Sequence, residues 1–154
     1  MAISFLSKKL LPPARPGLYQ FDIADNDSKS RVHIRLDEDG SGLLVVNASR
    51  VVHLNPTAVQ MAYYHLSKAE EKEAVRALSK LFRAPKSQIS QDYARISSQV
   101  GALVDEQSGL CPVCDLGLEK HMPFSATLSA PYRMDLALTY RCNNNCAHCY
   151  NARE

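Results

Sequence analysis

The chain changes from strands to helices at Arg50-Val51-Val52-His53-Leu54-Asn55-Pro56-Thr57-Ala58. The first five residues are rich in β-branched and other apolar side chains, which is typical of a short strand. Asn55 is a favoured residue for a helix N-cap, and proline is well tolerated at the first helical position that follows. The stretch therefore predicts a strand that ends at Leu54 and a helix that begins directly after Asn55.

The residues before this stretch have the patterns of further strands. Apolar residues alternate with polar ones, and in the clearest case Val32, Ile34 and Leu36 share one face. The predicted strands are 18–23, 31–36, 43–46 and 50–54, separated by a loop at 24–30, a glycine-containing turn at 39–42 and a short link at 47–49. Short links between consecutive strands predict a small antiparallel sheet.

The residues after Asn55 have helical spacing. Ala58, Met61, Ala62, His65 and Leu66 recur at the spacing of one helix face and predict a first helix. Ser67-Lys68-Ala69-Glu70 has the form of a capping box and predicts a second helix that starts near Lys68 and stops before Pro85, with Ala74, Val75, Leu78, Leu81 and Phe82 on its buried face. A third helix is expected over 87–106. The predicted fold class is therefore α+β, a small antiparallel sheet with a three-helix winged helix-turn-helix.

Composition limits the function classes that remain. The chain has 154 residues and a net charge of +2, too weak to indicate a nucleic-acid or membrane partner. A complete (β/α)₈ barrel needs roughly 200 residues or more. The N-terminal apolar run is shorter than a signal-peptide core and is followed by Lys8 and Lys9, and no run approaches the ~18 residues of a membrane span. We expect a cytoplasmic protein with no membrane partner.

Four regions are expected along the chain. Residues 1–16 form a flexible arm, because Pro12, Pro13 and Pro16 remove backbone donors. Residues 17–106 are long enough for one core and form the folded domain. Residues 107–131 are a linker that contains Cys111-Pro-Val-Cys114, and residues 132–154 begin a further domain.

All five cysteines lie between Cys111 and Cys149. An odd count gathered near one end indicates metal chemistry rather than a disulfide framework. Cys142-x₃-Cys146-x₂-Cys149 follows the alternating residues 134–140, which predict a strand. Soft thiolates suit iron–sulfur clusters, and three local thiolates would leave one iron of a four-iron cluster open to a small molecule.

This cysteine motif and its flanks resemble the radical S-adenosylmethionine enzymes, in particular members that modify peptides or mature other enzymes. The resemblance implies a 4Fe-4S cluster held by Cys142, Cys146 and Cys149, with S-adenosylmethionine on the fourth iron and an electron donor such as flavodoxin or ferredoxin. His148 occupies the position that is usually aromatic in the family and packs near the cofactor. Because the sequence ends at Glu154, we expect the front part of a longer enzyme, with an incomplete (β/α) barrel and no turnover alone.

Residues 17–106, with His53–Ala58 opening the first helix, are similar to the PqqD-like peptide-recognition domain. That resemblance implies a domain that binds the leader segment of a precursor peptide as an extra strand at a sheet edge, against the third helix. Strand addition lets backbone hydrogen bonds supply affinity while alternate side chains read sequence. By position, the receiving strand contains Arg50, Val51, Val52 and His53, and the groove is bordered by Ile89, Tyr93, Ile96 and Val100.

Alternatives remain for the metal ligands and for the protein as a whole. The three C-terminal cysteines could instead bind zinc or be incidental. Cys111 and Cys114 could join Cys146 and Cys149 in a zinc ribbon, have a redox role, or be incidental linker thiols. The whole chain could instead be a standalone peptide-binding module with a vestigial cluster loop, or a winged-helix DNA-binding regulator with an iron–sulfur or zinc redox sensor.

A basic stripe on the second helix bears on the regulator hypothesis. Lys68, Lys72, Arg76 and Lys80 recur every four residues and could contact DNA phosphates, or could form a solvated face with the neighbouring glutamates. The third helix, which would hold the recognition position, carries neutral or acidic residues at 88, 91, 92 and 99. We therefore expect no nucleic-acid partner.

Overall fold

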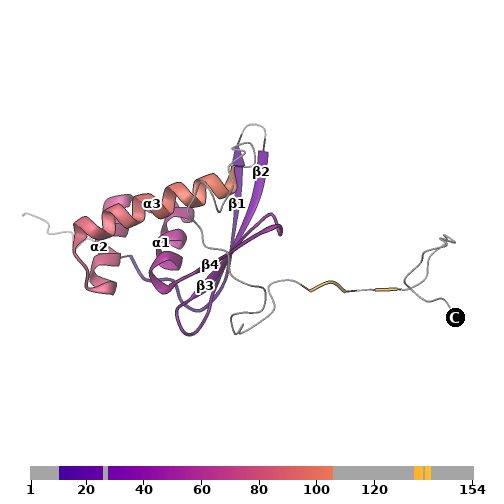
Figure 1. The fold of residues 1–154 in the computed structure, drawn as a ribbon, viewed down its shortest axis with the longest axis horizontal. Helices are drawn as coiled ribbons and strands as arrows, with labels where there is room; N and C mark the ends of the chain where they lie inside the picture. Colours follow the sequence, from indigo (N-terminus) through magenta and orange to yellow (C-terminus); the bar gives the residue numbers. More distant parts are fainter. Residues whose placement is uncertain (1–10, 26–27, 106–133, 137, 140–154) are drawn as a thin grey trace, which may run out of the picture.

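The computed structural model describes residues 11–25, 28–105, 134–136 and 138–139. Its element order is β1 (Gly17–Asp25), β2 (Ser28–Leu36), β3 (Gly42–Val46), β4 (Arg50–Leu54), α1 (Pro56–Leu66), α2 (Glu71–Phe82) and α3 (Lys86–Val104). The four strands form one antiparallel sheet in the order β1-β2-β3-β4. The α+β class and the antiparallel sheet predicted from the sequence are confirmed (Figure 1).

The first two strands are longer than the sequence pattern indicated. The predicted loop at 24–30 is largely strand, because β1 and β2 remain paired as far as Asp25 and Ser28. The β3 and β4 strands agree with the prediction to within one residue. Ladder pairing extends a strand into polar residues, which a pattern of apolar side chains does not detect.

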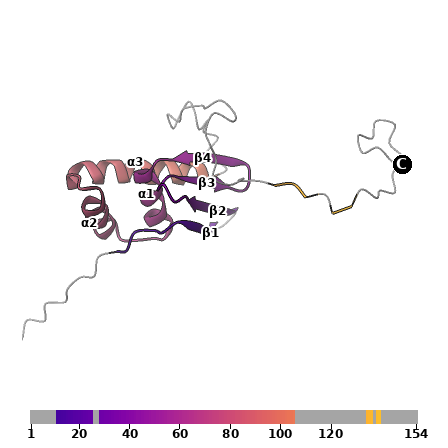
Figure 2. The same ribbon diagram turned by 90° about the horizontal axis from the view of Figure 1, so that it is seen from below.

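One face of the sheet packs against the helices. Val32, Ile34 and Leu36 on β2 are buried and lie opposite Val46, Leu44 and Gly42 on β3. The α1 helix contacts β2, β3 and β4 from this side. Figure 2 shows the strands in order from β1 to β4 with the helices gathered beside them. The sheet is thus covered on its apolar face by helices.

The start of α1 follows the local sequence. The Asn55 side chain accepts a hydrogen bond from the Ala58 amide at 2.8 Å, and Pro56 occupies the first helical position. This satisfies one of the backbone donors that a helix start leaves without an intrahelical partner. The predicted cap and boundary of α1 are therefore confirmed.

The start of α2 differs from the prediction. Helix α2 begins at Glu71, and its N-cap Glu70 makes no side-chain capping hydrogen bond. The supposed capping box instead ends α1, because Lys68 has a left-handed φ of 55° and its amide donates to the His65 carbonyl, while the Ala69 amide donates to the Tyr64 carbonyl. Such bonds satisfy the last carbonyls of a helix. The capping-box interpretation was wrong.

Two clusters of apolar side chains hold the elements together. The sheet cluster joins the strands to α1 and α3 and contains Val32, Ile34, Leu36, Leu44, Val46, Val59, Ala62, Leu66, Val100 and Leu103. The helix cluster joins the three helices and contains Met61, Tyr64, Ala74, Val75, Ala77, Leu78, Ile89 and Tyr93. Leu81, expected on the buried face of α2, is 44% exposed. The α1 helix contributes to both clusters and is the centre of the fold.

Part of the predicted flexible arm packs on this body. Leu11 lies against the helix cluster and Ala14 against the sheet cluster. Hydrogen bonds to the side chains of Gln60 and Tyr64 fix this segment. Residues 11–16 are therefore an ordered approach to β1, and the rest of the predicted arm lies outside the described residues.

Candidate functional site

The predicted receiving strand β4 is a terminal strand of the sheet that the structure describes, where it pairs with β3 alone. Register places Val52 opposite Leu44 on the core face, and Val52 packs partly buried against the sheet cluster. Because successive side chains of a strand point to opposite faces, Val51 and His53 lie on the other face of the sheet, where His53 is exposed. A terminal strand has one row of backbone groups available to a further strand.

Arg50 connects this edge to α3. Its Nη1 donates a hydrogen bond of 2.6 Å to the Leu103 carbonyl oxygen. The next carbonyl along α3, that of Val104, accepts a hydrogen bond of 3.1 Å from the Ser30 hydroxyl on β2. Two of the carbonyls at the end of α3 are thus satisfied by side chains of the sheet, which fixes the helix end against it.

The predicted groove residues on α3 are divided between the two clusters. Ile89 and Tyr93 are buried in the helix cluster against α1 and α2, with exposures of 2% and 5%. Ile96 is partly buried and packs against both clusters, and Val100 is buried in the sheet cluster. The structure therefore brings Ile96 and Val100 into the same cluster as Val52, whereas Ile89 and Tyr93 close the helical core.

The predicted cluster ligands Cys142, Cys146 and Cys149, with His148, lie outside the described residues, as do Cys111 and Cys114. The strand expected over 134–140 is not formed at 134–136 or 138–139, where Met134, Leu136 and Leu138 are 77%, 69% and 88% exposed. The described sheet consists of β1, β2, β3 and β4 and does not include these residues. Within the described ranges, no group of three or more His, Cys, Asp or Glu could hold a metal ion.

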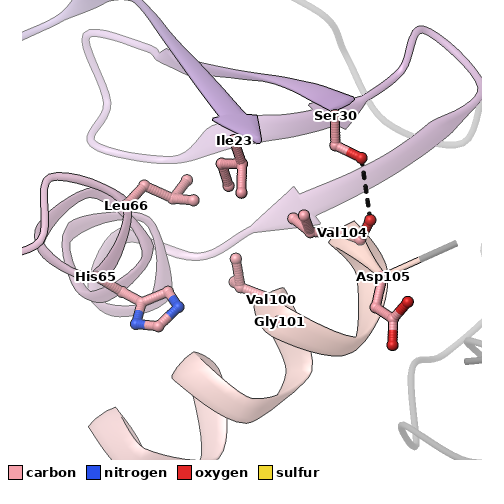
Figure 3. Close-up of a pocket in the computed structure, with 8 residues that line it drawn as sticks. All are labelled: Ile23, Ser30, His65, Leu66, Val100, Gly101, Val104 and Asp105. Carbon is pink, nitrogen blue, oxygen red and sulfur yellow. Dashed lines mark hydrogen bonds between the residues drawn. The ribbon is translucent and has the colours of Figure 1, made fainter. Parts of the chain in front are cut away.

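A hollow of about 260 Å³ lies where the end of α3 meets β1, β2 and the end of α1 (Figure 3). Its lining is mainly apolar and consists of Ile23, Ser30, His65, Leu66, Val100, Gly101, Val104 and Asp105. Burial lowers the pKa of the His65 imidazole below its usual value of 6.5. The Ser30 hydroxyl is engaged with Val104 and also accepts from the Asn47 side chain at 3.2 Å, so it serves as a structural link rather than as a nucleophile.

Sequence reasoning did not find this hollow or the contacts that frame it. The sequence pattern places Ser30 in a loop and, by position, predicts that Arg50 binds a peptide. A buried serine and an arginine that satisfy a helix end have no local sequence signal, because their partners lie 74 and 53 residues away.

The solvent-facing side of α3 shows what a nucleic acid would meet. Its exposed positions between 86 and 98 carry Lys86, Ser87, Gln88, Gln91, Ala94, Arg95 and Ser98. Of the two cations among them, Arg95 is engaged by Asp92 at 3.3 Å. The residues of the predicted basic stripe, Lys68, Lys72, Arg76 and Lys80, are all exposed as well. Over the described residues, no helix has the length and apolarity to cross a membrane.

Comparison of the chain with models of protein families, with curated proteins and with solved structures found no match.

Proposed function

We propose that residues 17–105 form a peptide-recognition domain of the winged helix-turn-helix type, which accepts an extended peptide as an added strand beside β4. In the same proposal, the chain is the N-terminal portion of a cytoplasmic radical S-adenosylmethionine enzyme that modifies or matures a peptide. The peptide is the leader segment of a precursor, and the electron donor is of the flavodoxin or ferredoxin class.

The observation that carries the proposal is the position of β4. It ends the described sheet, and its core-facing residues Val52 and Leu54 are only partly buried. An added strand would pair with the outer backbone groups of β4 and would cover these side chains further. Because strand neighbours align in register, alternate peptide side chains would lie beside Val52 and Leu54, which supplies a basis for sequence preference.

Helix α3 would form the second wall of such a site. Arg50 ties the last turn of α3 to the first residue of β4, so the angle between strand and helix is set before a ligand arrives. Ile96, partly buried between the two clusters, is the member of the predicted α3 set with remaining exposed surface beside the sheet cluster. A preset site lowers the ordering cost of binding.

The redox part of the proposal rests on the three cysteines that are available as cluster ligands. Cys142, Cys146 and Cys149 would hold a 4Fe-4S cluster, because three soft thiolates suit its iron and leave one iron for S-adenosylmethionine. When bound, the cluster would supply the electron that cleaves the sulfonium of S-adenosylmethionine. His148, next to Cys149, would pack near the cofactor.

Peptide capture tests the recognition domain. A displayed library of short random peptides is selected against the full chain, and a photo-crosslinking residue is then placed at His53 or at Leu18. These two exposed positions lie in the same cross-strand row but at opposite edges of the sheet. Crosslinking from position 53 and not from 18 is expected, and the reverse result would overturn the β4 assignment.

The chemistry of strand addition has its own control. N-methylation of alternate backbone amides of a selected peptide should abolish binding, because those amides would donate to β4, whereas methylation of the intervening amides should leave binding intact. Equal tolerance of both methylation patterns would show that the peptide does not bind as a strand.

Anaerobic reconstitution of the full chain with iron and sulfide tests the cluster. The expected product is brown, with the broad visible absorption of iron–sulfur charge transfer. Cys142→Ala combined with Cys146→Ala and Cys149→Ala should remove the colour, whereas Cys111→Ala with Cys114→Ala should retain it. Zinc uptake without cluster formation would favour a zinc site and would refute this part of the proposal.

A further inference from the structure

Residues 11–16 contact the body of the protein through the side chains of Leu11 and Ala14 and through hydrogen bonds of their backbone groups. The Ala14 amide donates to Gln60 Oε1 at 2.9 Å, and Gln60 Nε2 donates back to the Ala14 carbonyl at 3.0 Å. Gln60 lies on α1 and is 7% exposed. A buried side-chain amide thus pairs with one backbone unit at two points, as a neighbouring strand would.

Two tyrosine hydroxyls hold the backbone on either side of Ala14. The Tyr64 hydroxyl donates to the Pro12 carbonyl at 3.1 Å. The Tyr19 hydroxyl donates to the Arg15 carbonyl at 2.8 Å and accepts from the Arg15 amide at 3.0 Å. Backbone groups of Pro12, Ala14 and Arg15 are therefore all recognised without dependence on their side chains.

The tyrosines belong to one aromatic group. The Tyr63 ring lies between the other two, with centroid distances of 4.9 Å to Tyr19 and 5.8 Å to Tyr64. Burial raises the pKa of the Tyr64 hydroxyl above 10.0, so it remains a donor throughout the neutral range. We call the surface formed by Tyr19, Gln60, Tyr63 and Tyr64 the tyrosine surface.

The segment that lies on the tyrosine surface is preordered. Pro12, Pro13 and Pro16 fix their own φ near the value of the polyproline II helix, and each also restricts the residue before it to extended conformations. Such segments expose their carbonyls and lose little entropy on binding, which is why aromatic surfaces with hydrogen-bond donors recognise them. Residues 11–16 have the properties of a bound ligand of this kind.

We propose that the tyrosine surface is a binding site for short proline-containing extended peptides, and that residues 11–16 occupy it in cis. A tethered segment acts at an effective concentration on the order of millimolar, so a free peptide of the same chemistry must displace it. The site is separate from β4, because Tyr19 lies on β1 at the opposite edge of the sheet. This site can therefore be tested independently of the proposed leader site.

Displacement of the tethered segment can be measured in the full chain. The probe is a fluorescein-labelled synthetic peptide with the sequence of residues 11–17, and the readout is fluorescence anisotropy. A chain carrying Pro12→Gly, Pro13→Gly and Pro16→Gly should bind the probe at least about tenfold more tightly than the natural sequence, because its own segment competes less well. A control probe with glycine at the same three positions should bind at least about tenfold more weakly than the proline probe to this chain.

Variants of the tyrosine surface are made in the chain with the weakened segment. Tyr64→Phe keeps the ring and removes the hydroxyl, which should weaken probe binding about fivefold. Gln60→Ala should weaken it further, whereas Gln91→Ala, an exposed glutamine on α3, should have no effect. Circular dichroism establishes that each variant is folded. If Gln60→Ala unfolds, the probe affinity of Tyr64→Phe alone tests the tyrosine surface.

Three results would overturn the proposal. They are equal probe affinity for the natural and weakened chains, equal binding of the proline and glycine probes, and unchanged affinity in Tyr64→Phe. Crosslinking from position 53 is expected to be the same in all these chains, which separates this site from the β4 edge.

Discussion

The Arg50 guanidinium donates a hydrogen bond of 2.6 Å to the carbonyl oxygen of Leu103, across 53 residues of sequence. Arg50 is the first residue of β4, and Leu103 lies in the last turn of α3. A cation at this end of a helix satisfies a free carbonyl and complements the helix dipole. The contact therefore sets the position of α3 relative to the edge strand at which we propose that a peptide binds.

Replacing Arg50 with methionine should destabilise the fold by about 1–2 kcal/mol, because a charge-assisted hydrogen bond is lost and the Leu103 carbonyl is left without this partner. Urea unfolding measures the change. The matched control is Arg31→Met, which removes an exposed 3.4 Å ion pair with Asp22 and should cost no more than about 0.5 kcal/mol. An equal decrease in unfolding free energy in the two variants would show that the Arg50 contact stabilises the fold no more than the exposed ion pair does.

Gly42 is required for the close approach of α1 to β3. A Cβ at this position would lie 2.7 Å from Val59 Cγ2 and would also meet the Arg35 carbonyl oxygen. Gly42→Ala should therefore destabilise the fold by about 1–3 kcal/mol. At Gly101 on α3 an added Cβ meets nothing within 4 Å, so Gly101→Ala should stabilise the fold by up to about 1 kcal/mol. Thermal unfolding of the two variants should give shifts of opposite sign.

The β3–β4 turn contains a strained alanine. Asn47 and Ala48 have φ values of 50° and 55°, and the Ser49 amide donates to the Val46 carbonyl across them. Glycine adopts a positive φ at no steric cost, whereas the Cβ of alanine disfavours it. Ala48→Gly should stabilise the fold by about 0.5–1 kcal/mol.

The control for this turn is an alanine in regular helix. Ala94→Gly, on the exposed side of α3, should destabilise by about 1 kcal/mol in the same denaturation assay. A loss of stability in both variants would mean that the turn at 47–48 is not strained in solution.

His65 should make stability depend on pH. Because burial lowers its pKa in the folded state below 6.5, the unfolded chain takes up the proton first as the pH falls. Stability is therefore expected to decrease as the pH falls through 6.5 and to level off below the folded-state pKa. The measurement is the difference in unfolding free energy between the natural chain and His65→Gln across this range, and a constant difference would contradict the prediction.

Interactions between residues that are close in the chain made part of the fold predictable from the sequence. The alternation in 31–36 and the Asn55-Pro56 pair act over a few residues, and both predict the observed elements. Ser67–Glu70 was misread because a capping box and the end of the preceding helix compete for the same residues, and backbone bonds at Lys68 and Ala69 decide between them. The paired extension of β1 and β2 likewise depends on a partner strand rather than on either pattern alone.

The residues of the predicted groove were also only partly predictable from the sequence. A helical repeat of apolar residues identifies which face of α3 is buried, but it cannot say against which neighbour. Packing of α2 against α3 places Ile89 and Tyr93 in the helix cluster and leaves Ile96 and Val100 to the sheet cluster. In contrast, β4 is a terminal strand of the described sheet, as the predicted receiving strand requires.

The sequence by itself determined the α+β class, the strand–cap–helix transition at 50–58 and the cysteine motif that motivates the redox proposal, because each depends on residues close together in the chain. Tertiary structure alone decided which side chains satisfy the end of α3, how α1 approaches Gly42, and that Gln60 and two tyrosines hold residues 11–16. Backbone groups at helix ends and in extended segments find distant partners only when the chain folds, so no local pattern records them.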